Sequence, residues 1–330
     1  MTTMTQIEDS YGRQFKTLRV SLTNTCNLGC VYCIDESHEN QPLQATKPLP
    51  TVSTSQKPLS VPAFIEAIGV LHQILNLEAV RLTGGEPTLY RDLLPLMQGI
   101  GQQGISAIKM TTNGYLLAPK IEPYAKAGLT SLNISLDAIE PEPFFRISRR
   151  RNLRKILDGI ERAIQLGLDV KINCVVMRGL NEDQIVPLLR FSRERNIPIR
   201  FLELMQMGHL YGNFEDYFFP EPAILNQIRQ YADFTPLPRD PSATAKYWQL
   251  ADGFRFGIIS NESDPFCNDC NRLRLDSYGN IYGCLSDNTP IAIAGLLHKP
   301  ELLRQQLQAA LLQKKTRFAG STLSMLAIGG

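Results

Sequence analysis

The stretch Ser21-Leu-Thr-Asn-Thr-Cys-Asn-Leu-Gly-Cys-Val-Tyr-Cys-Ile34 carries three cysteines, Cys26, Cys30 and Cys33, at C-x3-C-x2-C spacing. The apolar run Leu18–Leu22 before them predicts a strand, so the thiols lie on the loop that follows it. Three thiolates on one short loop can bind a metal centre together, but a structural zinc ion and a [4Fe–4S] cluster usually take four protein ligands. The missing ligand indicates an iron left open for another molecule, with a zinc knuckle as the alternative.

Length and composition suit one large domain or two unequal ones. The formal charge of +2 over 330 residues provides no overall positive electrostatic potential that would attract nucleic acid. No apolar run approaches the ~20 residues of a membrane span, and the polar first ten residues do not resemble a signal peptide. Six of the seven cysteines fall in two clusters, which favours metal ligation in a reducing cytoplasm over disulfides. We therefore expect a cytoplasmic protein that binds neither nucleic acid nor membrane.

Strand and helix patterns alternate along most of the chain. We expect strands at 18–22, 79–83, 105–111, 129–136, 170–177 and 197–203, and helices at 61–75, 93–102, 119–127, 152–166 and 182–195. Such repeats predict a parallel sheet with right-handed crossovers, and therefore an α/β fold. From about Gly208 the pattern gives way to Gly, Pro and aromatic residues, with short strands near 254–259 and 273–276 and a helix at 302–313. We expect two regions, 1–208 and 209–330.

Two stretches lack either pattern. Residues 1–16 are expected to form a loose arm. Residues 35–62 are rich in Pro, Gln, Ser and Thr and predict a long loop, a kind that is usually functional or disordered. The seventh cysteine, Cys174, lies in an apolar strand and is expected to be a small core residue.

The expected strand 79–83 runs into Thr83-Gly84-Gly85-Glu86-Pro87. Two glycines let a backbone approach a ligand closely, and a carboxylate can accept from an ammonium group. A tight turn between strand and helix is the alternative. Together with the cysteine triplet, this motif resembles the radical S-adenosylmethionine (SAM) enzymes. In that family the open iron of a [4Fe–4S] cluster chelates SAM, and one electron splits SAM into methionine and a 5′-deoxyadenosyl radical.

The resemblance implies a partial (β/α)6 barrel whose active site lies at the C-terminal ends of the strands. It also implies that SAM is held by the cysteine loop, the glycine turn and the ends of the fourth and sixth strands. Taken alone, Ser135 at the end of the fourth strand and Met205 after the sixth would each be interpreted as a core or turn residue. The residues concerned are Tyr32, Gly84, Gly85, Glu86, Ser135 and Met205.

A second triplet, Cys267, Cys270 and Cys284, has the spacing C-x2-C-x13-C and again lacks a fourth ligand. His298 would complete a zinc site. The neighbouring Asn271-Arg-Leu-Arg-Leu275 places two arginines two residues apart, so they project to the same face of an extended segment. Two guanidinium groups beside an open cluster suit a polyphosphate.

Over essentially its whole length the chain resembles the GTP 3′,8-cyclase family of molybdenum cofactor biosynthesis. The resemblance rests on both triplets and on Val80–Pro87, Thr111-Thr-Asn-Gly114, Asn133–Ala138, Lys171–Asn173, Ile199–Met205 and the terminal Ile328-Gly-Gly330. It implies two [4Fe–4S] clusters, SAM, and GTP as substrate. The open iron of the second cluster would meet the guanine base, and the product would be 3′,8-cyclo-7,8-dihydro-GTP, made by a lyase. GTP would be held by Arg19, Arg81, Thr111, Lys171, Arg200, Arg272, Arg274, Gly329 and Gly330.

The same resemblance implies three partners: a reductant protein, cyclic pyranopterin monophosphate synthase as the downstream enzyme, and a second copy in a homodimer. The Gly329-Gly330 tail would enter the active site, since a segment without side chains fits a narrow cavity. The chain also departs from the family. Ala79 stands where a lysine is common, Gly29 replaces a frequent arginine, Ile34-Asp35 follows the first triplet where Met-Pro or Leu-Pro is frequent, and 285–290 are atypical.

Two other functions stay open at this stage. A radical SAM enzyme that modifies a peptide through an auxiliary cluster would explain both triplets, but not Arg272, Arg274 or the glycine tail. A zinc-stabilised nucleotide-binding protein without catalysis would leave Gly84-Gly85-Glu86 unexplained.

Overall fold

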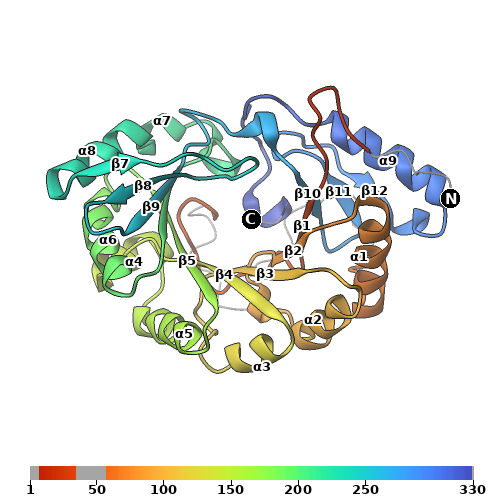
Figure 1. Cartoon of the computed structure of the whole chain (residues 1–330), viewed down its shortest axis with the longest axis horizontal. Helices are drawn as coiled ribbons and strands as arrows, with labels where there is room; N and C mark the ends of the chain where they lie inside the picture. Colours follow the sequence, from red (N-terminus) through yellow and green to blue (C-terminus); the bar gives the residue numbers. More distant parts are fainter. Residues whose placement is uncertain (1–6, 35–56, 329–330) are drawn as a thin grey trace.

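A curved sheet with helices on its outer face forms the frame of the molecule (Figure 1). The computed structural model describes residues 7–34 and 57–328, so the predicted loop 35–62 lies mostly outside the described residues. Six strands run parallel in sequence order. They are β1 (Thr17–Ser21), β2 (Ala79–Thr83), β3 (Ala107–Thr112), β4 (Leu129–Ser135), β5 (Asp169–Val176) and β6 (Ile199–Glu203). The expected partial (β/α)6 barrel is confirmed.

Helices cross over between these strands and cover the outside of the sheet, as Figure 1 shows. They are α1 (Val61–Leu75), α2 (Leu93–Gly101), α3 (Ile121–Lys126), α4 (Pro141–Ser148), α5 (Leu153–Gln165) and α6 (Ile185–Glu194). The predicted helix 182–195 is a short 3-10 turn followed by α6, and α4 was not predicted. Local signals fix α1 at both ends, because the Ser60 side chain accepts from the Ala63 N–H and Asn76 leaves the helix at a φ of 50°.

Strand β5 shows how the sheet separates core from interior. Val170, Ile172, Cys174 and Val176 are buried and pack against the helices, so the predicted core position of Cys174 is confirmed. The alternate residues of the strand face the inside of the barrel and are only partly buried or exposed. This two-residue alternation is what lets a barrel carry a polar interior beside an apolar core.

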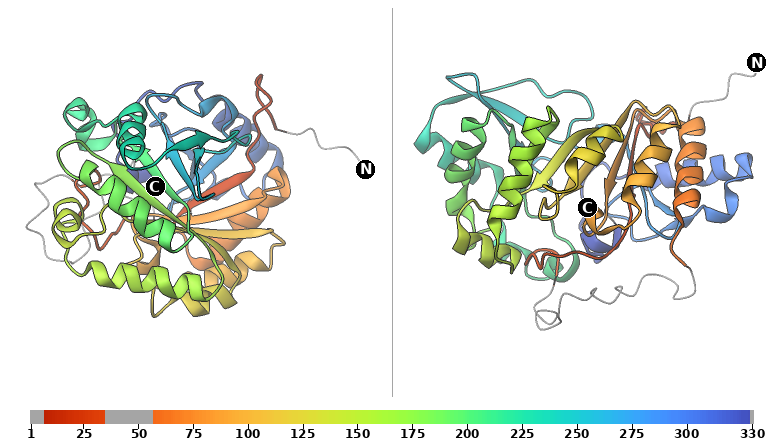
Figure 2. Two further views of the ribbon diagram at one scale, coloured as in Figure 1. Left: turned by 60° about the vertical axis from the view of Figure 1, so that its left-hand side comes forward. Right: turned by 90° about the horizontal axis from the view of Figure 1, so that it is seen from below.

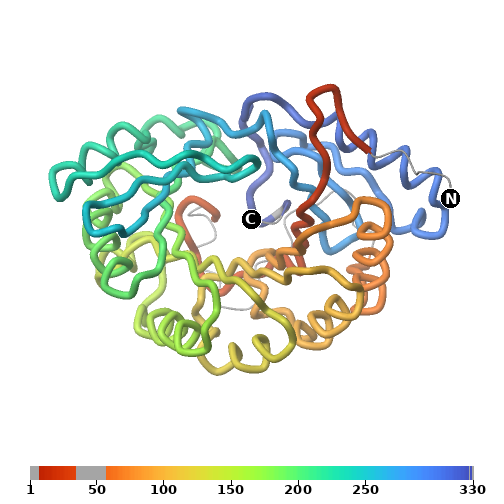
Figure 3. The backbone as a smooth tube through the Cα atoms, in the orientation of Figure 1, coloured from red at the N-terminus to blue at the C-terminus, as the bar shows by residue number. Residues whose placement is uncertain are grey.

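The region after β6 extends both edges of this sheet. It contains α7 (Phe214–Tyr217), α8 (Glu221–Tyr231), β7 (Phe234–Pro236), β8 (Lys246–Leu250), β9 (Arg255–Ile259), β10 (Arg272–Leu275), β11 (Asn280–Tyr282), β12 (Ile291–Ala292), α9 (Pro300–Leu312) and α10 (Met325–Ile328). Strand β9 pairs parallel with β6, whereas β10 pairs parallel with β1. The strand order is therefore β12-β11-β10-β1-β2-β3-β4-β5-β6-β9-β8-β7. Figure 3 shows this part of the chain, cyan to blue, along both flanks of the barrel. The boundary at residue 208 stays a prediction.

The prediction of a loose arm over 1–16 is wrong for residues 7–16. Phe15 is fully buried, and Arg13 is 5% exposed. The Arg13 guanidinium bonds Asp9 and donates to the carbonyls of Cys267, Lys314 and Lys315. The three carbonyl groups lie 254 to 302 residues away from Arg13 in sequence, so no local pattern predicts these contacts. None of the helices in the described residues is long and apolar enough to cross a membrane.

Candidate active site

One cavity of about 640 Å³ lies inside the barrel, and all six clustered cysteines line it. Its walls come from residues along β1 to β6 and beyond their C-terminal ends, from β10 and from the end of the described chain. In Figure 2 the loop of the first triplet (red) and α10 (dark blue) lie at the same end of the barrel. The parallel strands therefore bring residues that are up to 300 positions apart to one chamber.

The first triplet forms a group of three partly buried thiols on one loop. Burial raises the pKa of Cys26 to about 11, and burial followed by Cys26 raises that of Cys33 further. Three such groups become thiolates only beside a strong positive charge, which the irons of a cluster provide. The Asn113 amide donates to Cys26 Sγ at 3.7 Å. Within residues 7–34 and 57–328, no group of three or more His, Cys, Asp or Glu is arranged to hold a single metal ion. The donor set and its burial fit an iron–sulfur cluster.

The glycine turn after β2 packs directly on this loop. Gly85 N donates to the Thr23 carbonyl at 2.6 Å, and Glu86 N donates to the Thr25 carbonyl at 2.9 Å. A Cβ on Gly84 would lie 2.5 Å from the Thr23 oxygen, at a φ of +143° that only glycine adopts easily. A Cβ on Gly85 would lie 2.3 Å from the Thr25 oxygen. The glycines therefore allow the turn to hold the cysteine loop.

We expect Gly85→Ala to lower the free energy of unfolding of the metal-free protein by about 1–3 kcal/mol, since the backbone at Thr25 must move aside. Gly101→Ala is the matched control, because nothing lies within 4 Å of the added methyl group. Urea unfolding followed by circular dichroism measures both variants. Equal stabilities would show that the turn does not hold the loop through close contact.

Glu86 is fully buried, and the residues that line the cavity do not include it. Its Oε1 accepts from Thr88 N, Thr88 Oγ1 and Thr112 Oγ1, and its Oε2 accepts from Asn113 N at 2.7 Å. The carboxylate thereby ties the glycine turn to the end of β3. Its predicted contact with SAM stays a prediction, and in this structure its partners are backbone and hydroxyl groups of the protein.

Tyr32 lines the cavity, and its hydroxyl donates to Asp137 Oδ2 at 2.7 Å. Asp137 Oδ1 accepts from Val175 N at 2.8 Å, and burial raises the pKa of Asp137 to about 6. Asp137 lines the cavity too, as do the predicted Ser135 and Met205. Sequence reasoning noted the motif Asn133-Ile-Ser-Leu-Asp137 but gave Asp137 no role. Its place at the end of β4 is the signal that could have found it.

The second triplet lines the same cavity, beside the partly buried Arg272 and the buried Lys314. Burial raises the pKa of Cys270, but Arg272 and Lys314 outweigh this effect and lower the pKa to about 6. Lys314 is 8% exposed, and its Nζ lies 3.1 Å from Cys270 Sγ. No motif marks Lys314, which sequence reasoning missed. His298 is not among the lining residues and instead pairs with Glu66, so the geometry gives no support to a zinc site completed by it.

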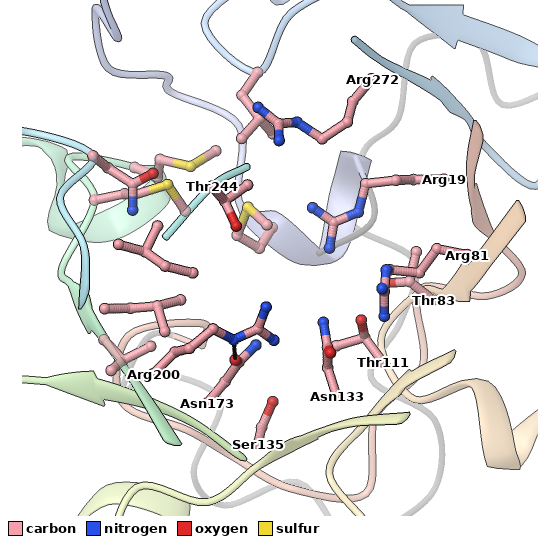
Figure 4. A pocket seen from close by; sticks show the side chains of 18 of the residues that line it. Arg19, Arg81, Thr83, Thr111, Asn133, Ser135, Asn173, Arg200, Thr244 and Arg272 are labelled. Carbon is pink, nitrogen blue, oxygen red and sulfur yellow. Dashed lines mark hydrogen bonds between the residues drawn. The ribbon is translucent and has the colours of Figure 1, made fainter. Parts of the chain in front are cut away.

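Five arginines line the cavity, and four of them are labelled in Figure 4, where they point toward a common space from different walls. Pairing of β1 with β2 and β10 places Arg19 opposite both Arg81 and Arg274. Burial, then Arg19 and Arg200, lowers the pKa of Arg81 to about 9. Four buried polar atoms of this wall have no hydrogen-bond partner within the described residues: Arg19 Nε, Thr111 Oγ1, Asn133 Oδ1 and Arg200 Nη2. A polyanion would balance the charge and accept from three of these atoms, Arg19 Nε, Arg200 Nη2 and Thr111 Oγ1, whereas Asn133 Oδ1 needs a donor.

Lys171 differs from the arginines. It is not among the lining residues, and its Nζ forms an ion pair with Asp169 at 2.5 Å. Its predicted contact with the nucleotide stays a prediction. Lys109 lines the cavity instead, on β3 directly opposite Arg81, and sequence reasoning did not select it. Gly329 and Gly330 lie outside the described residues, but Met325 and Leu326 of α10 line the cavity just before them.

Comparison with known proteins gives two family matches. The description "Radical SAM superfamily" matches residues 20–192, and "Molybdenum Cofactor Synthesis C" matches residues 197–320. A GTP 3′,8-cyclase of Listeria welshimeri is 34% identical and covers 93% of this chain and 90% of its own. The structure of Streptococcus suis SuiB bound to S-adenosylmethionine matches with a TM-score of 0.58 at 16% identity, over 86% of this chain and 65% of that one, and shows the fold alone.

The molybdenum cofactor biosynthesis protein 1 of Bos taurus is 36% identical over 95% of this chain. The alignment covers 49% of that protein, so this chain spans about half the length of such relatives. The two family matches follow each other along the sequence in the order that the two cysteine triplets do. The chain therefore belongs to the radical SAM superfamily and, within it, to the family of the GTP 3′,8-cyclases of molybdenum cofactor biosynthesis.

Proposed function

We propose that this protein is a radical SAM GTP 3′,8-cyclase, a lyase that makes 3′,8-cyclo-7,8-dihydro-GTP from GTP. The observation that carries the proposal is one cavity that is lined by both cysteine triplets and by five arginines. One triplet serves SAM and the other the guanine base, while the arginines take the triphosphate between them. The named relatives support the same reaction.

Two [4Fe–4S] clusters are proposed, one on Cys26, Cys30 and Cys33 and one on Cys267, Cys270 and Cys284. When bound, the first cluster and SAM would supply the radical that takes the 3′-hydrogen of GTP. The C3′ carbon would then bond to guanine C8, and one further electron from the reductant and a proton at N7 would complete the dihydro product. The chain contributes positions and charges. Gly84 and Gly85 present backbone to SAM, Tyr32 and Asp137 close the wall beside the first triplet, and Lys314 stabilises the thiolate of Cys270.

The peptide-modifying alternative is less well supported. An open groove for a peptide does not need buried guanidinium groups, yet Arg274 is 5% and Arg200 9% exposed on the cavity wall. A non-catalytic zinc protein would leave the close packing of the glycine turn on the first triplet without a purpose. Anaerobic incubation with SAM, GTP and a chemical reductant, followed by mass spectrometry, tests the reaction. Zinc without labile sulfide in anaerobically purified protein would overturn the proposal.

We expect the protein to bind GTP more tightly than GMP, because the basic wall recognises the added phosphates. Arg272→Met should weaken GTP binding at least about tenfold, since one charge-assisted contact contributes about 1.5–3 kcal/mol. Arg154→Met is the control, because Arg154 is an exposed helix residue paired with Asp158. Equilibrium dialysis of the SAM-loaded protein with both nucleotides gives the affinities. Equal affinities for GTP and GMP in the unmodified protein would exclude a triphosphate site.

The partners and the location follow from the same proposal. A reductant protein supplies the electron, cyclic pyranopterin monophosphate synthase consumes the product, and two copies form a homodimer. A cytoplasmic location agrees with the cysteine usage, because thiols that ligate clusters need a reducing compartment.

A further inference from the structure

Lys109 lines the cavity, but it is not among the residues that the sequence predicts to bind GTP. It lies on β3 with its side chain toward the barrel interior, and it lines the cavity together with Arg81. Within the described residues its ammonium group makes no hydrogen bond or ion pair, whereas the neighbouring Lys171 is held by Asp169. A partly buried lysine without a partner is costly, which indicates that a ligand completes it.

Charges of both signs surround Lys109. Burial lowers its pKa first, and then Arg81 and Lys171 lower it, whereas Asp169 and Glu78 raise it. Asp169 is already bonded to Lys171 at 2.5 Å. Since Asp169 is paired with Lys171, an added anion would find two cations side by side, Lys109 and the Arg81 guanidinium opposite it on β2.

The sheet register connects Lys109 with the departure at Ala79. Strands β2 and β3 run parallel with Ala79 opposite Ala107 and Arg81 opposite Lys109. Ala79 is on the same face of β2 as Arg81, and Thr17, its partner on β1, lines the cavity. Positions 79 and 109 are thus diagonal neighbours on the inner face, roughly 7–8 Å apart. A lysine side chain is long enough to bridge that distance.

Resting on the proposed function, we propose that Lys109 contacts the triphosphate of GTP and supplies the positive charge that the family commonly carries at position 79. The positive charge then lies on β3 instead of β2, and the phosphate-binding wall remains positively charged. Its neighbours in that wall are Arg81 and Arg19.

The test compares nucleotide affinities of the SAM-loaded, cluster-containing protein by equilibrium dialysis. Lys109→Met should weaken GTP binding about tenfold or more and leave GMP binding unchanged, because GMP lacks the outer phosphates. Lys126→Met is the matched control, since Lys126 is an exposed helix residue that pairs with Glu122. Lys109→Arg keeps the charge and should keep the preference for GTP, which separates loss of charge from disturbance of the strand.

The double variant Ala79→Lys with Lys109→Met should regain the preference for GTP over GMP, because a lysine on β2 restores the positive charge of the same wall. A GTP-to-GMP affinity ratio in Lys109→Met equal to that of the unmodified protein would overturn the proposal. If the double variant folds but does not regain the preference for GTP over GMP, a lysine at position 79 cannot do the work of Lys109, and this part of the proposal is wrong. Failure of the unmodified protein to prefer GTP is a different result, since it would remove the proposed function itself.

Discussion

Replacing Cys26, Cys30 and Cys33 together by alanine is expected to abolish SAM cleavage and to remove about half of the bound iron. The first triplet is the only one within the described residues that lies against the glycine turn, where SAM is proposed to bind. Two clusters of the same type contribute equal amounts of iron, so losing one leaves about half. Iron and sulfide analysis, with 5′-deoxyadenosine measured by chromatography, gives both quantities from one anaerobic preparation.

Two controls make this result specific. The triple variant at Cys267, Cys270 and Cys284 should lose the other half of the iron and still cleave SAM, though without forming cyclised GTP. Cys174→Ala should keep all of the iron, because Cys174 is buried among the core residues and lies outside both triplets. SAM cleavage that persists in the first triple variant would contradict the assignment of that loop.

Much of the barrel could be predicted because its signals are local. Strand β2 and helix α1 have the predicted bounds, and most other predicted elements of the barrel differ by one or two residues at an end, whereas α6 begins three residues later than predicted and α4 was not predicted. The two-residue alternation in β5 and the caps of α1 are properties of a few neighbouring residues. Both cysteine triplets and the glycine turn also fall at strand ends, where a barrel places its active site.

Other features depend on long-range pairing, which a sequence pattern does not reveal. Strand β10 inserts beside β1 and β9 beside β6, so one C-terminal region closes both sides of the site. The same pairing decides which cations reach the cavity. Lys314 approaches Cys270 from just beyond the end of α9, and Lys109 lines the cavity whereas Lys171 does not. Glu86 shows the opposite, because a motif marks it but the cavity does not reach it. The motif predicts a contact with a ligand, whereas in the fold four donors of the protein itself surround the carboxylate.

The tail is the other large effect that we expect. Helix α10 lines the cavity with Met325 and Leu326, and Ile328 is 1% exposed in a small cluster with Met207 and Tyr282. An isolated parallel β-bridge between Met207 and Ser321 holds the segment that precedes this helix. The described chain is thus held beside the cavity up to Ile328. Removing Gly329 and Gly330 leaves all of these contacts in place.

A protein that ends at Ile328 should therefore keep its unfolding midpoint, both clusters and SAM cleavage, while cyclised GTP falls by about 10²-fold. The reason is positional, because a small displacement of reacting groups costs about that factor in rate. SAM cleavage without cyclisation is the signature of a substrate that is bound but misplaced, and loss of fold or cluster would instead abolish both. The measurement is 5′-deoxyadenosine and cyclised nucleotide, quantified side by side in full-length and shortened protein. Cyclisation at the full-length rate would show that the two glycines take no part in the site, and that α10 alone forms this part of the wall.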